Sequence, residues 1–587
     1  MKPTDTSAPE YYHRVVNCQY ACPAHTPVPE YIRLIAERRY TDAYMVNWES
    51  NVFPGILGRV CDRPCEPACR RVRVEENPVA ICRLKRVAAD NKTSIDDRLP
   101  EVPTAKNGKR IALIGAGPAS LTVARDLLPL GYQVTLFDRE QKAGGMVRSQ
   151  IPSFRLPESV LDEEVDRILN MGVETRFGTD ITSLKAVIDE GFDALFIGTG
   201  APSGRDLKLP GRDQAGDKAQ VGINWLAGVA FEHIKTVGKK VIVLGGGNTA
   251  MDCCRTALRL GADEVKVVVR SSYEDMKASP WEKEDAAAEG IDIINHHVPH
   301  SYVVENGKLI GMRFEVVESV YDENGRRSLV PTGGEPVLIE CDEVLVAIGQ
   351  DATFPWIERD LGIEFDKWGM PVLNKSSLQS SLPTVFFGGD AAFGPENIIT
   401  AVAHGHQAAI SIDLFCEGKD VCDERPADQH TLISQKMGVH EWSYQNAVSN
   451  DVRQAVPHMD LQKAIKDLQA EVELGFDEKL ALAEAHRCLS CDVQTVFTAE
   501  RCIECGACED ICPMDCINFT QNGDEADLRN RLRVPATNTE HAVYVSKDLK
   551  TGQVMAKDED VCLHCGLCAE RCPTGAWDMQ KFILNPA

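Results

Sequence analysis

Two short runs of cysteine near the C-terminal end carry the clearest chemistry in the sequence. Each run has the spacing C-x2-C-x2-C-x3-C and is followed at once by proline. Thiolates at this spacing hold a 4Fe-4S cluster, whereas structural zinc sites seldom use such a run. The predicted cluster ligands are Cys502, Cys505, Cys508 and Cys512 in the first run, and Cys562, Cys565, Cys568 and Cys572 in the second.

The internal symmetry of the two runs predicts how they share ligands. In two-cluster ferredoxins the fourth cysteine of each run binds the cluster of the other run. Cys516 comes one position too late for the spacing, and we interpret it as a packing residue. Residues 513–561, between the runs, are polar and rich in turn formers, which predicts an exposed loop or, alternatively, a docking element. The expected sets are Cys502, Cys505, Cys508 and Cys572, and Cys562, Cys565, Cys568 and Cys512.

A second group of cysteines lies near the N-terminus with less regular spacing. Its six thiols cannot complete two four-thiol clusters. Cys488 and Cys491, in the sequence EAHRCLSC, have no cysteine close by that would complete a set of their own. If the fold brings the two segments together, eight thiols are available for two more 4Fe-4S clusters. The six N-terminal cysteines are Cys18, Cys22, Cys61, Cys65, Cys69 and Cys82.

The elements between these cysteines begin with a dinucleotide-binding pattern. Residues 109–138 read KRIALIGAGPASLTVARDLLPLGYQVTLFD, which predicts a buried strand, a glycine-rich turn, a helix and a second strand ending in an acid. Gly115 makes the tight turn, and Gly117 lets the backbone approach a pyrophosphate at the positive end of the helix. Asp138 is placed to accept hydrogen bonds from a ribose. Ser120 departs from the usual glycine or alanine.

A second dinucleotide-binding pattern follows at residues 239–272. Gly245, Gly247 and Ala250 occupy its three small-residue positions. Its second strand ends in Arg270 and Ser271, where an NAD site places an acid. An arginine there suits the 2′-phosphate of NADP, although it is equally compatible with a surface residue. The adjacent Cys253 and Cys254 in the helix are predicted to be core residues.

The sequence then returns to strands, and their order predicts the domains. EVLVAIGQ at 343–350 and TVFFGGDAAFG at 384–394 read as strands, with a helix from about residue 397. We expect residues 106–205 and 343–425 to form one discontinuous nucleotide-binding domain, with 206–342 inserted as a second. Residues 426–495 are helical in pattern and are predicted to be a linker that returns Cys488 and Cys491 to the N-terminal cysteines.

The expected fold class is therefore a multidomain α/β protein. It has an N-terminal α-helical iron–sulfur domain (1–105), two Rossmann-like nucleotide-binding domains, one inserted in the other, and a C-terminal α+β ferredoxin-like domain (496–587). The length of 587 residues is sufficient for four such units.

Composition narrows the class of function. The 22 cysteines accompany a formal charge of −25, which argues against nucleic acid as a partner. No apolar run approaches the roughly 18 residues that span a bilayer, and no secretion signal is visible at the start of the sequence. We expect a cytoplasmic protein in a reducing compartment, where clustered cysteines bind metal or carry out redox chemistry rather than form disulfides.

Together these motifs resemble the small-subunit family of bacterial glutamate synthase. That family includes the N-terminal half of dihydropyrimidine dehydrogenase and the large subunit of NADH-dependent ferredoxin:NADP oxidoreductase. The resemblance covers about residues 15–425, and the ferredoxin module is a fusion. The motifs that carry it are CPAHTPVPEYI, GRVCDRPCEPAC, VAICRLKRVAAD, GAGPAS, AGGMVRSQIPSFRLP, GGGNTAMD, VAIGQ and GGDAAFG.

The resemblance implies cofactors: FAD in the first nucleotide site and NADPH or NADH in the second. The family often has two adjacent arginines where this chain has Arg270 and Ser271, so the preference between the nucleotides stays open. The implied FAD contacts are Gly115, Gly117, Pro118, Asp138, Gly145, Met146, Gly389 and Asp390. The implied nicotinamide-nucleotide contacts are Gly245, Gly247, Asn248, Thr249, Arg270 and Ser271.

The family also implies how the remaining cysteines group. Its cluster region begins with EAxRCLxC followed by C-x3-C-P, whereas here EAHRCLSC lies near residue 490. Family members vary at the fourth ligand of one cluster, the position of Cys82. By analogy the two sets are Cys488, Cys491, Cys18 and Cys69, and Cys22, Cys61, Cys65 and Cys82.

The predicted function is an NAD(P)H oxidoreductase that exchanges electrons between a nicotinamide nucleotide, FAD and four 4Fe-4S clusters. Hydride transfer itself needs no acid or base, so no catalytic side chain is assigned. The predicted partner is ferredoxin or an iron–sulfur subunit of a larger complex, such as a 2-oxoacid:ferredoxin oxidoreductase or an aromatic-acid reductase. The alternatives are a glutamate synthase small subunit and a non-catalytic electron-conduit subunit.

Overall fold

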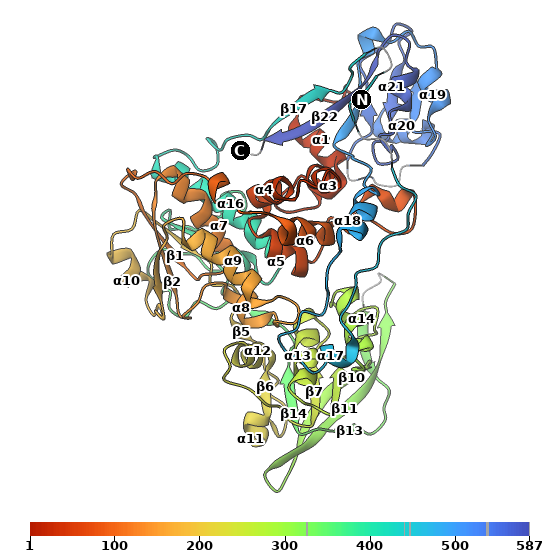
Figure 1. The fold of residues 1–587 in the computed structure, drawn as a ribbon. Helices are drawn as coiled ribbons and strands as arrows, with labels where there is room; N and C mark the ends of the chain where they lie inside the picture. The colour runs from red at the N-terminus through yellow and green to blue at the C-terminus, as the bar shows by residue number, and fades with distance from the viewer. Residues whose placement is uncertain (324–326, 439–440, 445–447, 536–538, 540, 586–587) are drawn as a thin grey trace.

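The computed structural model describes residues 1–323, 327–438, 441–444, 448–535, 539 and 541–585. The molecule is elongated, with a ferredoxin-like region at one end and the second nucleotide-binding region at the other (Figure 1). The N-terminal helices lie at the centre, beside the first nucleotide-binding region. The N-terminus itself reaches the ferredoxin-like region, where Thr4 N–H donates to the carbonyl of Val545.

The N-terminal region is a group of short helices around a shared core. Proline stands in the first turn of α1, α3 and α5, where its missing N–H costs nothing. Tyr31, Trp48 and Phe53 are fully buried at the centre of this region. The elements are α1 (Pro9–Val15), α2 (Asn17–Tyr20), α3 (Val28–Ala36), α4 (Tyr40–Asn51), α5 (Pro54–Val60), η1 (Arg70–Arg73), α6 (Ile81–Asn91) and η2 (Asp96–Arg98).

The first nucleotide-binding region is built on a parallel sheet in the order β16-β4-β1-β2-β3. Its buried strands are continuous apolar runs, as parallel sheets covered on both faces require. β16 comes from beyond the second sheet in sequence. The strands are β1 (Arg110–Ile114), β2 (Gln133–Asp138), β3 (Glu174–Phe177), β4 (Ala194–Ile197) and β16 (Val385–Phe387). The helices are α7 (Pro118–Leu127), η3 (Leu128–Leu130), α8 (Gly145–Gln150), α9 (Glu158–Leu169), α10 (Leu184–Asp189), α15 (Asp390–Phe393) and α16 (Ile398–Cys416).

The second nucleotide-binding region has its own parallel sheet, in the order β6-β14-β7-β8-β9. The boundary predicted at residue 343 is wrong, because β14 (Glu343–Val346) pairs with β6 and β7 of this sheet. The other strands are β6 (Ala219–Val221), β7 (Lys240–Leu244), β8 (Glu264–Val268) and β9 (Asp292–Ile294). The helices are α11 (Arg212–Ala215), η4 (Gly216–Lys218), α12 (Gly222–Ala230), α13 (Asn248–Arg259) and α14 (Pro280–Ala288). The two regions are joined by the short strands β5 (Ser203–Gly204) and β15 (Gln350–Asp351), which pair with each other.

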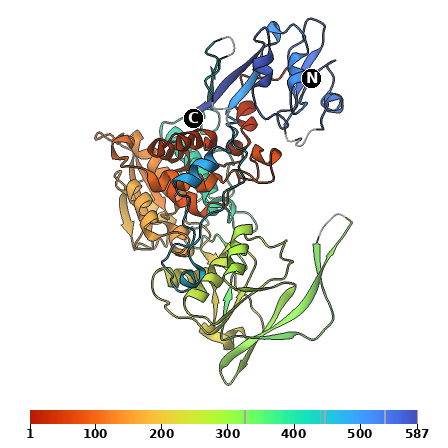
Figure 2. The same ribbon diagram turned by 45° about the vertical axis from the view of Figure 1, so that its right-hand side comes forward.

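An antiparallel sheet is inserted in this second region and projects from it (Figure 2). β11 is its centre and pairs with β10, β12 and β13. The strands are β10 (His297–Glu305), β11 (Lys308–Tyr321), β12 (Arg327–Pro331) and β13 (Val337–Glu340).

The ferredoxin-like region contains two small antiparallel sheets. One has the order β17-β22-β18, and β17 belongs to the segment directly after the first nucleotide-binding region. The strands are β17 (Gln429–Ser434), β18 (Val493–Phe497), β19 (Ile517–Thr520), β20 (Tyr544–Val545), β21 (Val554–Lys557) and β22 (Trp577–Asn585). The helices are η5 (Ala499–Arg501), α19 (Ala507–Ile511), α20 (Glu525–Arg531) and α21 (Leu567–Arg571).

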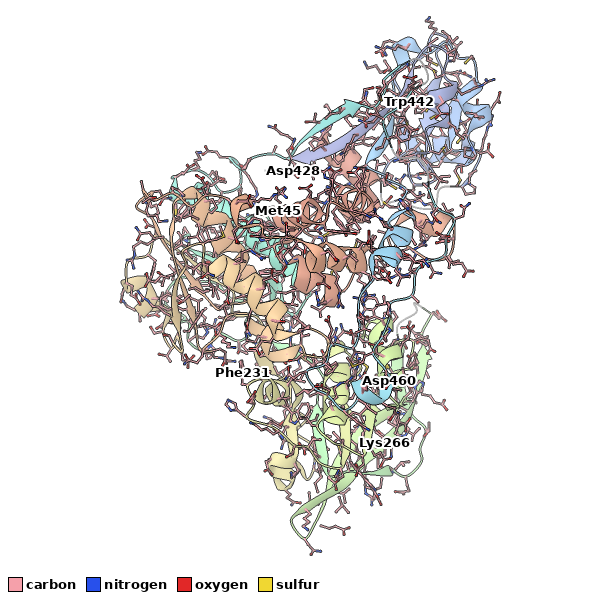
Figure 3. The ribbon with its side chains drawn as sticks, in the orientation of Figure 1. Met45, Phe231, Lys266, Asp428, Trp442 and Asp460 are labelled. Atoms are coloured by element: carbon pink, nitrogen blue, oxygen red, sulfur yellow. The ribbon has the colours of Figure 1, made fainter. Side chains whose placement is uncertain are left out.

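The prediction that residues 426–495 form a helical linker needs correction. Among its described residues, helix is confined to α17 (Leu461–Ala464) and α18 (Glu478–Ala485), while β17 is a strand. The segment has helical periodicity in its sequence, but tertiary contacts along its length determine its conformation. Figure 3 shows Trp442 at the ferredoxin-like end and Asp460 on the second nucleotide-binding region. The segment therefore crosses the molecule before α18 returns to the N-terminal helices.

The stretch between the two cysteine runs is also more ordered than an exposed loop. β20 and β21 pair with each other, and β21 pairs with β19. Leu528 of α20 is buried against Val545 and Val554. Residues 536–538 and 540 of this stretch lie outside the described residues. In the described part of the chain, no helix has the length and apolar character that crossing a membrane requires.

Candidate functional site

A cavity of about 670 Å³ lies between the two nucleotide-binding regions. Both glycine-rich turns reach it, together with the segment around residue 60 of the N-terminal region. All the side chains and glycines that were implied as FAD contacts line this cavity: Gly115, Gly117, Pro118, Asp138, Gly145, Met146, Gly389 and Asp390. The structure therefore brings these residues together from four separate segments.

Glycine is required at the floor of the cavity by close packing of the backbone. Gly115 has φ +93°, and a Cβ on it would lie 2.6 Å from the carbonyl oxygen of Gly198. Gly145 has φ +53°, and its Cβ would lie 2.8 Å from the Cα of Gly117. Gly117, at the start of α7, leaves open space on the cavity side, since a Cβ there meets nothing closer than 3.8 Å. That space suits a pyrophosphate at the helix N-terminus.

Two carboxyl groups line the cavity, Asp138 at the end of β2 and Asp390 at the start of α15. Asp138 Oδ2 accepts from Ala116 N–H at 2.6 Å, and its Oδ1 accepts from Glu140 N–H at 2.8 Å. Burial raises the pKa of Asp138 against these two hydrogen bonds. Burial also raises the pKa of Asp390, to about 6. Both side chains line the cavity and offer carboxyl oxygens as hydrogen-bond acceptors.

The second dinucleotide turn reaches the same cavity only in part. Asn248 and Thr249, at the start of α13, line it, so the two nucleotide sites face each other. Gly245 has φ +133° and packs directly on the carbonyl of Ala347. Arg270 is exposed beyond β8, while Ser271 is buried and its carbonyl accepts from the Asn295 side chain. Gly245, Gly247, Arg270 and Ser271 do not line the cavity.

Sequence reasoning missed three residues at this site. Val60 and Asp62, on either side of Cys61, line the cavity. Arg155 lines it from the loop between α8 and α9, where its guanidinium pairs with Asp252 of α13 at 2.6 Å. The motif AGGMVRSQIPSFRLP contains Arg155, which was the available signal. The contact of Val60 and Asp62 with the cavity depends on the packing of two regions and leaves no local pattern.

The cysteine nearest the cavity belongs to a set that we name the proximal set: Cys22, Cys61, Cys65 and Cys82. The thiol of Cys82 lies close to those of Cys61 and Cys65, and their proximity raises the pKa of both of these thiols. Lys85 lies among all four. All four cysteines are buried. The structure thus places Cys82, whose role was the least certain, together with the other three.

A second set, the middle set, joins residues far apart in sequence: Cys18, Cys69, Cys488 and Cys491. All four line one small cavity. α18 delivers Cys488, because it packs against α3 and α6 of the N-terminal region. Tyr31, fully buried on α3, lies among cysteines of both the middle and the proximal set.

The ferredoxin-like region holds the other two sets, with the exchanged ligands that the repeat symmetry predicted. The junction set is Cys512, Cys562, Cys565 and Cys568, which line one small cavity. The distal set is Cys502, Cys505, Cys508 and Cys572, which line another. Cys516 lies in the junction cavity with its Sγ 3.5 Å from that of Cys512. Its interpretation as a packing residue remains a prediction.

A shared backbone feature supports these sets as cluster sites. The residue two positions after one cysteine of each set has positive φ, which non-glycine residues seldom adopt. Its N–H donates to the sulfur of that cysteine in three of the sets at 3.3–3.4 Å: Arg63 to Cys61, Glu504 to Cys502 and His564 to Cys562. Ser490 has the same conformation and donates to Cys488. Amide hydrogen bonds to sulfur stabilise anionic clusters and tune their potential. By contrast, Cys253 and Cys254 are fully buried in an apolar core, as predicted.

Comparison with known families matches three parts of the chain. Residues 109–405 match the pyridine nucleotide-disulphide oxidoreductase family, residues 12–96 match the 4Fe-4S cluster domain II of dihydropyrimidine dehydrogenase, and residues 501–576 match a 4Fe-4S dicluster domain. The chain belongs to the pyridine nucleotide-disulphide oxidoreductase family. Within it, the predicted likeness to the glutamate synthase small subunit and dihydropyrimidine dehydrogenase is confirmed.

The curated relatives include two subunits of redox enzymes. The beta subunit of NADP(+)-dependent formate dehydrogenase from Moorella thermoacetica is 36% identical over 81% of this chain and 70% of its own length. The beta subunit of NADPH-Fe(3+) oxidoreductase from Geobacter sulfurreducens is 34% identical over 83% of this chain and 77% of its own length. The small chain of NADPH glutamate synthase from Escherichia coli is 31% identical over 68% of this chain and 88% of its own length.

These matches confirm the predicted enzyme class. The chain is an NAD(P)H-dependent oxidoreductase that uses flavin and 4Fe-4S clusters, and its fold is the predicted multidomain α/β arrangement. The donor sets fit these groups, since the four thiols of the middle, junction and distal sets each line one small cavity, and the large cavity is lined by residues of both dinucleotide-binding motifs.

Proposed function

We propose that this chain moves electrons in the cytoplasm between NADPH or NADH, one FAD and four 4Fe-4S clusters, in exchange with ferredoxin or an iron–sulfur partner subunit. The nucleotide would give up a hydride and leave oxidised, and the two electrons would leave the chain one at a time, with the proton released to solvent. When bound, FAD and the clusters supply this change from two-electron to one-electron chemistry. The residues of the chain bind and orient them.

One observation carries the proposal: a single cavity is shared by both dinucleotide turns and by the neighbours of Cys61. Asn248 and Thr249 line this cavity, which supports a nicotinamide nucleotide next to the flavin. Val60 and Asp62 also line it, which supports a position of the proximal set close to the flavin. A hydride donor, a two-electron acceptor and a one-electron acceptor would therefore meet at one point, which is the arrangement that such an enzyme needs.

The order of the remaining sets follows from their neighbours. Tyr31 lies between the proximal and the middle set. The junction set adjoins the distal set, since Cys568 lies close to Cys508. Cys505 of the distal set and Cys565 of the junction set are both exposed. Leu567, beside the junction set, is 36% exposed, whereas Ile503, beside the distal set, is 54% exposed. We place the exchange with a partner there. A 2-oxoacid:ferredoxin oxidoreductase or an aromatic-acid reductase is a candidate complex, and the two beta-subunit relatives support a place in a larger assembly.

Anaerobic mixing of the purified chain with NADPH or NADH tests the proposal. Loss of the visible flavin absorption band is the expected result. No bleaching by either nucleotide would contradict the enzyme function. Iron analysis tests the number of clusters, with about 16 iron atoms per chain expected for four clusters. About 8 would show that half of the cysteine sets hold no cluster.

A further inference from the structure

Arg70 joins the N-terminal region to the ferredoxin-like region by contacts that lie next to two cysteine sets. It directly follows Cys69 of the middle set and is 2% exposed. Its Nη1 donates to the carbonyl oxygen of Cys562, a member of the junction set, at 2.7 Å. The same nitrogen lies 2.9 Å from Nε2 of His564. One guanidinium thus links the chain next to one set with the chain of the other.

His564 makes a second link in the opposite direction. A guanidinium can only donate, so Nε2 of His564 accepts from Arg70 and the ring proton is on Nδ1. That Nδ1–H then donates to the carbonyl of Cys491, in the middle set, at 3.3 Å. Glu559 Oε2 lies 3.4 Å from Nε2, but Lys557 pairs with this carboxylate at 2.7 Å and Tyr11 donates to it at 2.7 Å.

The backbone of His564 is held in an unusual conformation that places the ring in this position. Its φ is +53°, and its N–H donates to the sulfur of Cys562 at 3.4 Å. Such a conformation is strained for a residue other than glycine and persists where the surroundings over-determine it. The corresponding residue of the distal set, Glu504, shares the conformation but is held by Thr551 within its own region. The contact with a second set is therefore particular to His564.

The surrounding polar groups fix Arg70 rather than compete with it. Asn17, next to Cys18, accepts from Arg70 Nε and donates to Asp560 at 3.2 Å. Arg73 pairs with Asp560 at 3.0 Å from the same short helix. Arg73 thus crosses the same interface without touching Cys562 or His564 through any described hydrogen bond. It is a natural control.

We propose that Arg70 and His564 are positioning residues that join the middle and junction sets, so that electrons pass between the two regions at Cys562 and reach the distal set only afterwards. The inference rests on the proposed function. Electron tunnelling weakens less across a chain of covalent and hydrogen bonds than across empty space. Cys69 through Arg70, and Cys491 through His564, each reach Cys562 by such a chain.

The test uses Arg70→Lys, His564→Leu and the control Arg73→Lys in the full-length protein loaded with flavin and iron. After mixing with reduced nucleotide, rapid-freeze electron paramagnetic resonance follows the reduction of the N-terminal and C-terminal clusters separately. Flavin bleaching should keep the parental rate in all variants. Reduction of the C-terminal clusters should slow at least about tenfold in Arg70→Lys and His564→Leu, and stay within about twofold in Arg73→Lys.

Three results would overturn the inference. One is parental reduction of the C-terminal clusters in both test variants at full iron content. Another is equal slowing in Arg73→Lys, which would indicate a general docking role. The third is iron loss in both test variants, which would make the pair structural. Cys505→Ser tests the order in which the two C-terminal clusters are reduced. The junction cluster should still be reduced in this variant. If it is not, the distal set receives electrons first. Failure of the proposed function would be seen separately, in the parent protein. Reduced nucleotide would then not bleach its flavin, or its iron content would be half of that expected.

Discussion

Arg155 of the first nucleotide-binding region and Asp252 of helix α13 form a buried ion pair of 2.6 Å beside the flavin cavity. Glu282 of α14 takes the second arm of the same guanidinium at 2.5 Å. Burial lowers the pKa of Arg155, but these two carboxylates outweigh it and raise it above the ordinary value. The neighbouring Phe154 is fully buried against Ala464 and Val472. Arg155 therefore joins the first nucleotide-binding region to the second, and Phe154 packs beside it against the segment of residues 426–495.

Replacing this arginine should loosen the two regions. Arg155→Met leaves Asp252 buried without its partner, while Glu282 keeps Arg255 at 3.2 Å, and the loss of one partner of a buried pair typically costs about 3–5 kcal/mol. We expect a lower melting temperature and faster proteolysis between the regions. Arg205→Met is the matched control, because Arg205 pairs with Asp351 at the surface and such pairs contribute about 0–1 kcal/mol. Equal melting temperatures for the two variants would contradict the fastening role.

Substitution of two glycines should distinguish the flavin site from the nicotinamide-nucleotide site. Gly117 has φ −83° and Gly247 has φ −104°, so alanine fits both backbones. A Cβ meets nothing closer than 3.8 Å at Gly117 and nothing within 4 Å at Gly247. Because each would obstruct a pyrophosphate, Gly117→Ala should lose flavin, whereas Gly247→Ala should keep flavin and need at least about tenfold more nucleotide for bleaching. Flavin absorbance and nucleotide titration of each variant measure these two effects. Loss of flavin in Gly247→Ala with flavin kept in Gly117→Ala would mean that the two sites are assigned the wrong way round.

Nucleotide preference should depend on Arg270. Removing a guanidinium that contacts a 2′-phosphate should raise the Kd for NADPH at least about tenfold, which is about 1.4 kcal/mol, with little effect on NADH. Anaerobic titration of Arg270→Ala with each nucleotide measures the change. Arg313→Ala, an exposed arginine of β11 in the same region, serves as control. If Arg270→Ala weakens the binding of both nucleotides equally, Arg270 does not contact the 2′-phosphate.

The two neighbouring thiols Cys512 and Cys516 should differ in iron binding. They lie 3.5 Å apart, so distance alone does not distinguish them. If Cys512 is the ligand, Cys512→Ser should lower iron from about 16 to about 12 atoms per chain, while Cys516→Ser leaves about 16. Iron analysis of both variants decides the matter. Iron loss confined to Cys516→Ser would reverse the assignment.

Asp390 should make the stability of the flavin-free protein depend on pH. Burial raises its pKa from the ordinary 3.8 to about 6, so the folded chain keeps a proton that the unfolded chain has lost. Stability then falls as pH rises toward about 6 and levels off above it. Unfolding of the parent and of Asp390→Asn between about pH 5 and 7 measures this difference. The asparagine variant should lack the decline, and parallel curves would contradict the assignment.

The predictable features were those that a short segment determines by itself. Gly115, Gly117 and Gly245 follow from the backbone of one turn, and the two cysteine runs follow from spacing. β14 was assigned to the wrong region because an apolar strand carries no mark of the sheet that it joins. β17 was missed for a related reason, since its partner β22 lies about 150 residues away. The cavity contact of Val60 and the ring position of His564 arise only when separate regions pack.

The sheet formed by β17, β22 and β18 has a consequence for exchanging parts between proteins. Its central strand comes from the ferredoxin-like region, while β17 directly follows the first nucleotide-binding region. A gene recombination that swapped only residues 496–587 would strip β17 of its partner and leave an unpaired edge, which invites aggregation. A successful graft of another ferredoxin would have to carry residues 426–495 with it. The ferredoxin-like region and residues 426–495 should therefore be exchangeable between proteins only as one unit.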